Sequence, residues 1–512
     1  MSTTSKDLKL EDEKNIEFIE NAGIKETPLK LDKHGVPLSP QPSDDPEDPL
    51  NWGHWYRAFI LLQVSVLSAL GYYNTASINP AYAQLSEEFG VSIVTASYQT
   101  TVSIALNGVG PFLFIPFAHV YGRRPVYLVT TLIGALSALG CAYAHNFGQL
   151  VGLRVLNGIF PVGAALGVAT ASDVYCLHER GRALGVFTVL STTGAHFAPI
   201  PGGLIGQFLG WRWVFKFAAI INSFCLIFTF FFLPETLYIR DANGTSTDSG
   251  FSSTNQKRSF FSRYVARLRL GRHFPGRELR LGDFFWPYFK MIRYPSVIFP
   301  AIYYATQYGL GSTLPAVTVS HIFAQEFGWD TLQIGLAYGA SLLVGALLGE
   351  TMGGWVVDGL MNRARRRAGP SAPSEIRLKA IWTGEIIVPV GLLWYGFSIQ
   401  YKAPWIVPIL GMGAACFGVQ CITTVMYTYV ADCHTSKSAE VAQVFNFVRQ
   451  EVGMTFAFYA IVLGEAIGGY HLLFVFFVCM GSILAFIPIL VLMWKGEEIR
   501  AAERRAFNKD DE

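Results

Sequence analysis

Several ionisable side chains fall inside long apolar runs of the sequence, where a charge is costly to bury, and four of them are candidates for moving protons. They are Arg154, His196, Glu350 and Glu385. Such a group usually faces protein or a water-filled path, and it often marks a route for ions or protons. Imidazole and carboxyl groups can bind and release a proton. The four residues therefore predict proton movement, with a structural ion pair as the alternative for Arg154.

The elements that must position these residues are about twelve apolar runs, about six on each side of a central polar loop. Of the 512 residues, 51% are hydrophobic and 15% are charged. A soluble protein carries about 25% charged residues, so the deficit indicates burial in lipid. Non-helical chain in lipid would leave backbone groups unpaired, and each run is expected to be a helix. The expected spans are 57–79, 97–118, 126–144, 149–172, 183–208, 213–233, 297–322, 332–357, 377–399, 404–431, 442–466 and 471–494.

These runs predict an all-α membrane protein with twelve transmembrane helices in two six-helix bundles. The N-terminal tail is polar and lacks an apolar signal core, so it is expected to be disordered, and the first span would direct insertion. The expected segments are a cytosolic tail at 1–52, a bundle at 53–236, a cytosolic loop at 237–296, a bundle at 297–494 and a cytosolic tail at 495–512.

Basic residues are distributed unevenly among the loops between spans. One set of loops holds Arg123 and Arg363 with many other arginines, whereas the alternate set holds only Arg212 and Lys402. Loops rich in basic residues stay in the cytoplasm. Both termini and the central loop are therefore expected there, and the sequon at Asn243 is expected to stay unmodified. The plasma membrane is the expected location, and the vacuolar membrane is the alternative.

The central loop mixes aromatic and basic residues in one stretch. Phe260 and Phe261 stand close to Arg263 and Arg267. This pattern is typical of an amphipathic helix on an anionic membrane surface. A solvated charged linker is the alternative.

Several function classes lack their sequence signals. The chain has no Gly-Lys-Ser/Thr phosphate loop, its seven cysteines form no CxxC pair, and no nucleophile–base or metal constellation is present. We therefore expect no ATP hydrolysis, no enzyme activity, no metal and no cofactor. A proton gradient remains as the energy source. We expect a monomer in the lipid bilayer with a small-molecule substrate and no nucleic-acid partner.

Turns between spans carry the clearest motif. His119 is followed by Gly122, Arg123 and Arg124, and Gly-Arg-Arg at this place resembles the signature of the major facilitator superfamily. The equivalent turn in the second half ends in Asp358. Further echoes between the halves include Asp173 against Asp432 after spans four and ten. Such internal repeats are typical of secondary transporters.

The resemblance extends from Asp48 to about Lys495 and is strongest to the fungal drug:proton antiporter branch with twelve helices, the DHA1-like group. It implies that Arg154 takes part in proton transfer. It implies that Glu385 is a weaker proton carrier than Glu350, because helix nine of this family is usually peripheral. The helix-five antiporter motif, associated with export, is matched by Gly194, Pro199, Gly202 and Gly203.

The resemblance also implies a set of gating residues at the cytoplasmic ends of the helices. Arg449, with Asn446, forms a polar face of span eleven and is expected to pair with Asp432 or Glu350. The gating set comprises His119, Gly122, Arg123, Arg124, Asp173, Asp358, Asp432, Asn446 and Arg449.

Helices one, four, seven and ten line the cavity of this family, and here they carry many aromatic and polar residues. Span one holds Tyr72, Tyr73 and Asn74 in succession. Aromatic walls favour apolar or cationic ligands, and ordinary helix packing is the alternative for each residue. The predicted cavity residues are Tyr73, Asn74, Asn157, Tyr304, Gln307, Tyr308, Gln420, Thr424 and Tyr427.

These observations predict a proton-coupled secondary transporter. The favoured hypothesis is an antiporter that exports a xenobiotic or a secondary metabolite. The alternative within the same fold is a proton-coupled importer of a polyamine, an organic cation or another nutrient. A receptor or a membrane-bound enzyme is not favoured.

Overall fold

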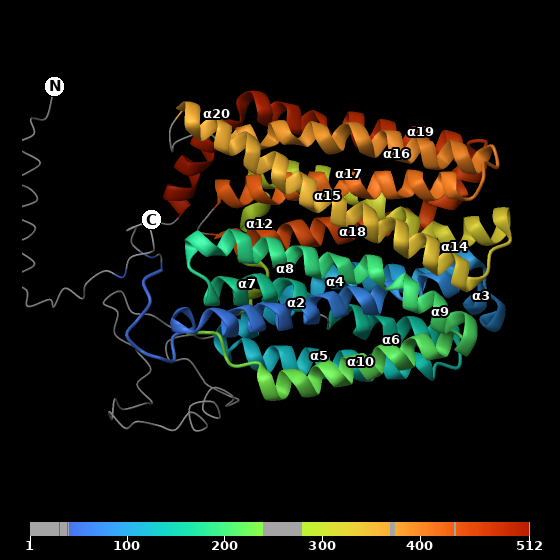
Figure 1. Cartoon of the computed structure of the whole chain (residues 1–512), viewed down its shortest axis with the longest axis horizontal. Coiled ribbons are helices and arrows are strands. Elements are labelled where there is room, and N and C mark those ends of the chain that lie inside the picture. Colours follow the sequence, from blue (N-terminus) through green and yellow to red (C-terminus); the bar gives the residue numbers. More distant parts are fainter. Residues whose placement is uncertain are drawn as a thin grey trace, which may run out of the picture.

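The computed structural model describes residues 30, 38, 40–160, 162–238, 279–368, 374–434 and 437–510. These residues contain helices and no strand. Figure 1 shows the helices side by side, with the start of α2 (His54–Ala76) and the end of α20 (Ile487–Asp510) at the same end of the bundle. We call this end the terminal end and the other the distal end. Residues 239–278, which include Asn243 and the expected amphipathic helix, lie outside the described residues.

The N-terminal bundle contains six membrane-crossing helices, three of which are interrupted. They are α2 with α3 (Tyr82–Phe89), α4 (Ile93–Val120), α5 (Arg123–Ala142), α6 (Phe147–Ile159) with α7 (Gly163–Val174), α8 (Leu177–Phe197) with α9 (Pro199–Leu209), and α10 (Trp211–Phe232).

The C-terminal bundle repeats this arrangement after the short helix α12 (Trp286–Ile292). Its helices are α13 (Pro295–Tyr308) with the π-helical turn η4 (Gly309–Thr313) and α14 (Leu314–Phe327), α15 (Thr331–Ala368), η5 (Ser374–Ile381) with α16 (Trp382–Gln400), α17 (Ile406–Cys433), α18 (Ser438–Ala466), and α19 (Tyr470–Val478) with η7 (Cys479–Leu484) and α20.

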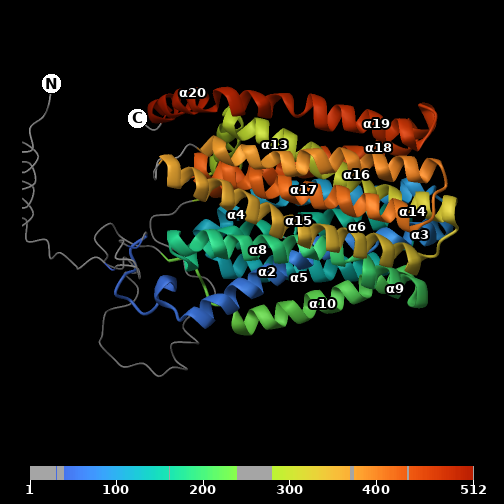
Figure 2. The ribbon, with the colours of Figure 1, turned by 45° about the horizontal axis from the view of Figure 1, so that its top comes forward.

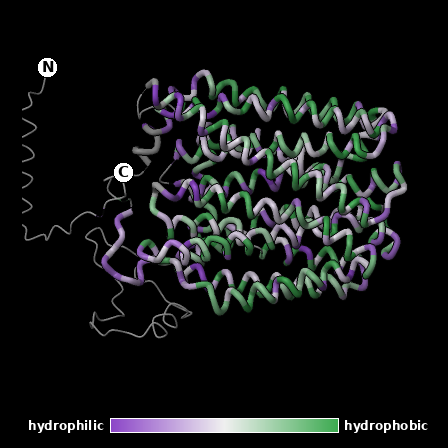
Figure 3. Tube along the Cα trace, in the orientation of Figure 1, coloured by the Kyte–Doolittle hydropathy of each residue, from purple (hydrophilic) through white to green (hydrophobic). Residues whose placement is uncertain are grey.

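Ten helices in the described part of the chain are long and apolar enough to cross a bilayer. The α13–η4–α14 helix and α18 complete the twelve expected from the sequence. The helix α18 is less apolar because it carries Asn446, Arg449 and Gln450, which are buried inside the protein. Figure 3 shows hydrophobic residues along the helices and hydrophilic residues gathered toward the terminal end. This distribution fits a bilayer around the middle of the bundle.

The two halves meet along four helices at the centre of the molecule. The helix α4 packs against α18, and α8 and α9 pack against α15. In both Figure 1 and Figure 2, α10 lies at one edge of the bundle and α19 at the opposite edge. The interface between the halves is therefore centred on α4, α15, α18 and the two-part helix α8–α9, and α14 adds contacts with α3 and α4 at the distal end.

Glycines in α8 and α9 bring these helices into backbone contact with both halves. A Cβ on Gly194 would lie 2.3 Å from the carbonyl oxygen of Ala69, and one on Gly202 would lie 1.8 Å from that of Ser77. A Cβ on Gly203 would lie 2.8 Å from the Cα of Gly335 on α15. Small residues of this kind permit close helix approach in membranes. The antiporter-like motif therefore fixes α9 between the end of α2 and α15.

Part of the N-terminal segment differs from the expected disordered tail, and the C-terminal segment continues the last helix. The chain around Asp48 is packed rather than disordered: the Asp48 side chain is fully buried and accepts hydrogen bonds from the backbone N–H groups of Ser43 and Leu50. At the other terminus α20 continues to Asp510, well past the expected boundary at 494. Arg500 of this extension donates two hydrogen bonds of 2.6 Å to Glu375, and these bonds attach the added turns of α20 to η5.

We expect Gly202→Ala to destabilise the protein by about 1–3 kcal/mol, because the added methyl group collides with the backbone of Ser77. Thermal unfolding of the purified protein in detergent measures the change. The matched control is Gly185→Ala in α8, where a Cβ meets no atom within 4 Å. Equal melting temperatures for the two variants would contradict the close packing of α9 on α2.

Candidate functional site

A buried arginine lies between the two halves. Arg449 of α18 is 3% exposed and donates hydrogen bonds to the Tyr72 hydroxyl (3.0 Å) and to Oδ1 of Asn446 (2.9 Å). Its guanidinium lies 4.5 Å from the ring centre of Tyr308 and 5.6 Å from that of Tyr72. Tyr72 belongs to α2, so the arginine connects the N-terminal half to the C-terminal half. Asn446 strengthens this connection by donating to the carbonyl oxygen of Asn107 at 3.3 Å.

Two further tyrosines complete the surroundings of this arginine. The ring of Tyr304 lies 5.8 Å from that of Tyr308 and 5.5 Å from that of Tyr427. We call Tyr72, Tyr304, Tyr308 and Tyr427 the tyrosine cluster. The expected face shared by Tyr304 and Tyr308 is present, and Tyr427 of α17 joins it. Together the four rings surround one positive charge with phenol groups.

The expected carboxylate partners of Arg449 are elsewhere. Asp432 pairs with Arg377 at 2.6 Å, and Glu350 accepts a hydrogen bond of 3.4 Å from Thr192. The prediction of an ion pair between Arg449 and either acid is therefore wrong for this structure. The reason is that Asp432 stands at the terminal end of α17, where Arg377 of η5 reaches it first.

His196 and Glu350 both lie where α8 meets the C-terminal half. His196 is 1% exposed, and its Nε2 lies 3.5 Å from the Ser312 hydroxyl and 3.9 Å from the Cys416 sulfur. Ser312 belongs to the π-helical turn η4, and such turns often occur at functional sites. Thr192, which contacts Glu350, precedes His196 by one helical turn. The structure thus brings these two titratable groups to one interface.

Glu385 is separate from that interface. It lies inside the C-terminal half, where its carboxylate accepts hydrogen bonds from the Tyr303 hydroxyl and from Nε2 of Gln307. Gln307 also donates to the carbonyl oxygen of Gly481 in η7, at 3.2 Å. The amide of Gln307 thus connects three helices of one half, and its place in the cavity stays a prediction.

Arg154 holds the end of a broken helix. It is fully buried and donates to the carbonyl oxygens of Asn74 (2.8 Å) and Thr75 (3.0 Å), in the last turn of α2. A third hydrogen bond goes to Oδ1 of Asn157 at 2.7 Å. The last carbonyls of a helix have no partner within it, so the guanidinium supplies one. No described residue forms an ion pair with Arg154, which leaves the structural ion pair without support.

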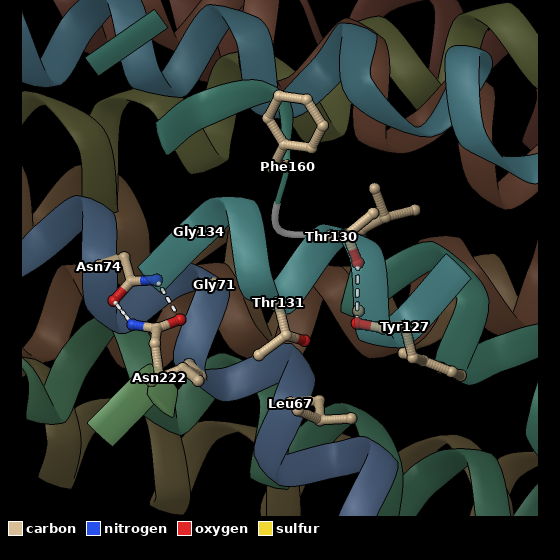
Figure 4. A pocket seen from close by; sticks show the side chains of 12 residues that line it. Leu67, Gly71, Asn74, Tyr127, Thr130, Thr131, Gly134, Phe160 and Asn222 are labelled. Atoms are coloured by element: carbon tan, nitrogen blue, oxygen red, sulfur yellow. Dashed lines mark hydrogen bonds between the residues drawn. The ribbon is translucent and has the colours of Figure 1, made fainter. Parts of the chain in front are cut away.

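Three predicted cavity residues, Tyr73, Asn74 and Asn157, have their contacts within the N-terminal half. Figure 4 shows Asn74 and Asn222 exchanging side-chain hydrogen bonds of 3.2 and 2.8 Å beside a cavity of about 20 Å³. That volume holds about one water molecule and no larger substrate. Asn157 donates to the Ser137 hydroxyl at 3.3 Å in the same half. Tyr73 packs in the core of this half, whereas its neighbour Tyr72 reaches Arg449.

Gln420 and Thr424 lie on the side of α17 that faces α15. A Cβ on Gly349 would lie 3.0 Å from the Cβ of Gln420, and one on Gly353 would lie 3.4 Å from the Thr424 hydroxyl. Gln420 is 1% exposed, and both of its amide atoms lack a hydrogen bond to any described residue. Gln420 therefore provides a buried donor and acceptor on the same stripe of α17 as Tyr427.

The Gly-Arg-Arg turn at the terminal end is organised by Glu235. Its carboxylate accepts the backbone N–H groups of Arg123 (2.8 Å) and Arg124 (3.1 Å). The Arg123 side chain binds Asp173 at 3.2 Å. Gly122 has φ +98°, and a Cβ there would lie 2.3 Å from Glu235, so glycine is required. Burial raises the pKa of the Glu235 carboxyl, although these backbone donors act in the opposite direction.

The C-terminal half replaces the missing Gly-Arg-Arg turn by other residues. The pair of Asp432 with Arg377 corresponds to that of Asp173 with Arg123. Sequence reasoning missed Arg377 because it compared only the turn ending in Asp358. Asp358 itself is exposed and contacts no described residue by a hydrogen bond or ion pair. His119 is exposed in the last turn of α4.

Comparison with known proteins agrees with this arrangement. Residues 64–458 match the family model described as Major Facilitator Superfamily. The chain belongs to this superfamily. It is 28% identical to the MFS-type transporter mpsC of Macrophomina phaseolina over 89% of this chain and 87% of that protein. It is 26% identical to the efflux pump radE of Floropilus chiversii over 90% of this chain and 84% of that protein.

A solved structure shares the fold of this facilitator. The bacterial homologue of the human lysosomal transporter Spinster, in an inward-facing and unoccupied conformation, superposes with a TM-score of 0.55. It is 15% identical and covers 90% of this chain and 99% of its own. The facilitator is therefore a multi-pass membrane protein with the twelve-helix fold, and its relatives are fungal transporters.

We expect Glu235→Gln to lower the free energy of unfolding by about 1–3 kcal/mol, since an amide NH₂ cannot accept the backbone N–H group that one carboxylate oxygen binds. Thermal unfolding in detergent measures this loss. Asp358→Asn is the matched control, because the exposed Asp358 has no such partner among the described residues. A stable Glu235→Gln protein would show that the Gly-Arg-Arg turn does not depend on this carboxylate.

Proposed function

We propose that this facilitator is a proton-coupled antiporter that exports an organic secondary metabolite. The observation that carries the proposal is the position of Glu350 and His196 at the interface between the halves. Both groups are titratable. His196 of α8 contacts Ser312 of the C-terminal half, and Glu350 of α15 contacts Thr192 of α8. A proton on either group can therefore change the contact between the halves, which is what alternating access requires.

The direction of transport is supported by two observations. The glycines at positions 194, 202 and 203, which match the antiporter motif, give α8 and α9 close contacts with α2 and α15, and the relative radE is named an efflux pump. With the terminal end in the cytoplasm, as the loop charges predict, export moves substrate from the terminal end to the distal end. The plasma membrane is the location that such export favours, and a single chain is sufficient for this mechanism.

Export requires that the distal contacts between the halves open. Gln84 of α3 donates to the Thr331 hydroxyl at 3.2 Å, and Ser320 of α14 donates to the carbonyl oxygen of Asn79. These polar contacts close the distal end of the interface in this structure. Protonation from the distal side would then accompany substrate release, and proton release at the terminal end would accompany substrate uptake.

A pH gradient distinguishes this antiporter from the importer that remains its rival. The purified protein is reconstituted into liposomes, and the uptake of the dyes fluorescein and rhodamine 123 is followed. An antiporter accumulates dye when the lumen is acidic, because protons leave as dye enters. A symporter accumulates dye when the outside is acidic. Protein-free liposomes control for passive entry.

We expect Glu350→Gln to reduce gradient-driven dye accumulation at least tenfold, because the amide cannot carry a proton. Exchange of dye for dye without a gradient should stay within about twofold, since this step needs no net proton transfer. Glu497→Gln on the exposed surface of α20 is the control. Full accumulation by the Glu350→Gln protein would remove Glu350 from the coupling scheme.

A further inference from the structure

We propose that Arg449 and the tyrosine cluster form a subsite for an acidic group of the substrate, such as a carboxylate or an acidic enol. The inference rests on the proposed transport function, because it takes the interface between the halves as the substrate path. It replaces the preference for apolar or cationic ligands that the aromatic residues alone suggested.

The first observation is the charge balance around Arg449. An arginine 3% exposed would ordinarily be compensated by a carboxylate, since a buried unpaired charge is costly. The hydrogen bonds it donates go instead to two neutral groups, the Tyr72 hydroxyl and the Asn446 amide oxygen. Its Nε is buried and makes no hydrogen bond to a described residue. The site thus holds a positive charge and an unused donor.

The second observation is the place of this charge in the fold. Arg449 bridges α18 to α2 through Tyr72, and Asn446 bridges α18 to α4. A ligand bound there would touch both halves and could respond to their movement. A structural arginine is better placed inside one half, as Arg154 is, where backbone carbonyls receive its donors.

The third observation is the chemistry of the surrounding groups. A guanidinium binds a carboxylate through two parallel hydrogen bonds, and this geometry favours acidic ligands over neutral ones. Tyrosine hydroxyls can donate to the same ligand. Gln420 lies two helical turns from Tyr427 on the same stripe of α17, and its amide, which has no described hydrogen bond, could serve other polar atoms of a larger ligand. The aromatic faces would contact a ring attached to the acid.

A cationic ligand fits this site poorly. The guanidinium of Arg449 already lies over the faces of Tyr72 and Tyr308, at 5.6 and 4.5 Å from the ring centres. A second cation would be repelled by the first. Two acidic residues also lie at the interface, Glu350 of α15, which accepts a hydrogen bond from Thr192, and Glu451 of α18, which faces Gly108 of α4. Neither carboxylate forms a described hydrogen bond or ion pair with Arg449 or the tyrosine cluster.

The test compares three probes that share one ring system and differ in charge. They are 2-naphthoate, 2-naphthamide and 2-naphthylmethylamine. Binding to the purified full-length protein in nanodiscs is measured by titration calorimetry. We expect 2-naphthoate to bind at least tenfold more tightly than the amide, and the amine to bind most weakly. Equal affinity for the acid and the amide would overturn the proposal.

Variants then test whether Arg449 is responsible for the preference for the acid over the amide. Arg449→Gln should weaken 2-naphthoate at least tenfold and leave 2-naphthamide unchanged, whereas Arg449→Lys should retain part of the preference because it keeps the charge. Arg366→Gln, at an exposed arginine of α15, is the matched control. An equal loss for acid and amide in Arg449→Gln would also overturn the proposal, because it would indicate a general change in the fold.

Tyr72→Phe keeps the inference testable if Arg449→Gln does not fold. It leaves the charge in place and removes one hydroxyl that holds it, so the preference for the acid should fall while the amide binds as before. An unchanged preference would contradict the role of Tyr72. The liposome experiment tests the transport proposal separately. If dye accumulated under neither of the two pH gradients, the transport proposal would be refuted. A preference for the acid in nanodiscs would still establish the subsite.

Discussion

The cost of leaving polar groups unpaired in an apolar interior shapes this whole molecule. Helix ends within the bundle must find partners, because the bilayer supplies no water. Arg154 meets this requirement for α2, whose last carbonyls accept its hydrogen bonds. The break after α2 then allows α3 and Asn79 to contact α14, so the distal closure between the halves depends on one guanidinium inside the N-terminal half.

At the terminal end the same requirement is met differently in each half. Glu235 receives the backbone N–H groups of the Gly-Arg-Arg turn, whereas the C-terminal half uses Arg377 with Asp432. The extension of α20 adds the pair of Arg500 with Glu375. The halves therefore share a fold although their polar contacts at the terminal end differ. The contacts of one half can be altered with limited effect on those of the other half.

Much of the fold was predictable because apolar length and loop charge are local properties of the chain. The twelve helices and the two halves follow from them. The site was less predictable: Tyr72 and Tyr73 are adjacent, and only the rotation of α2 decides that Tyr72 faces Arg449. The partner of Asp432 is Arg377, which comes from a connection that differs between the halves. Side-chain pairing across helices depends on such rotations, which composition and spacing leave undetermined.

The contact of Gly203 with Gly335 has a mechanical consequence. Two helices that touch through glycines present smooth backbone surfaces, with no interlocking side chains to disengage. When α9 tilts against α15, no rotamers need to change at that point, and the contact can persist while the helices on either side separate. The pair would then act as a pivot when the terminal end of the interface opens, and the terminal end would travel farther for a given rotation. Opening of the distal end would instead require the neighbouring contact of Gln84 with Thr331 to break.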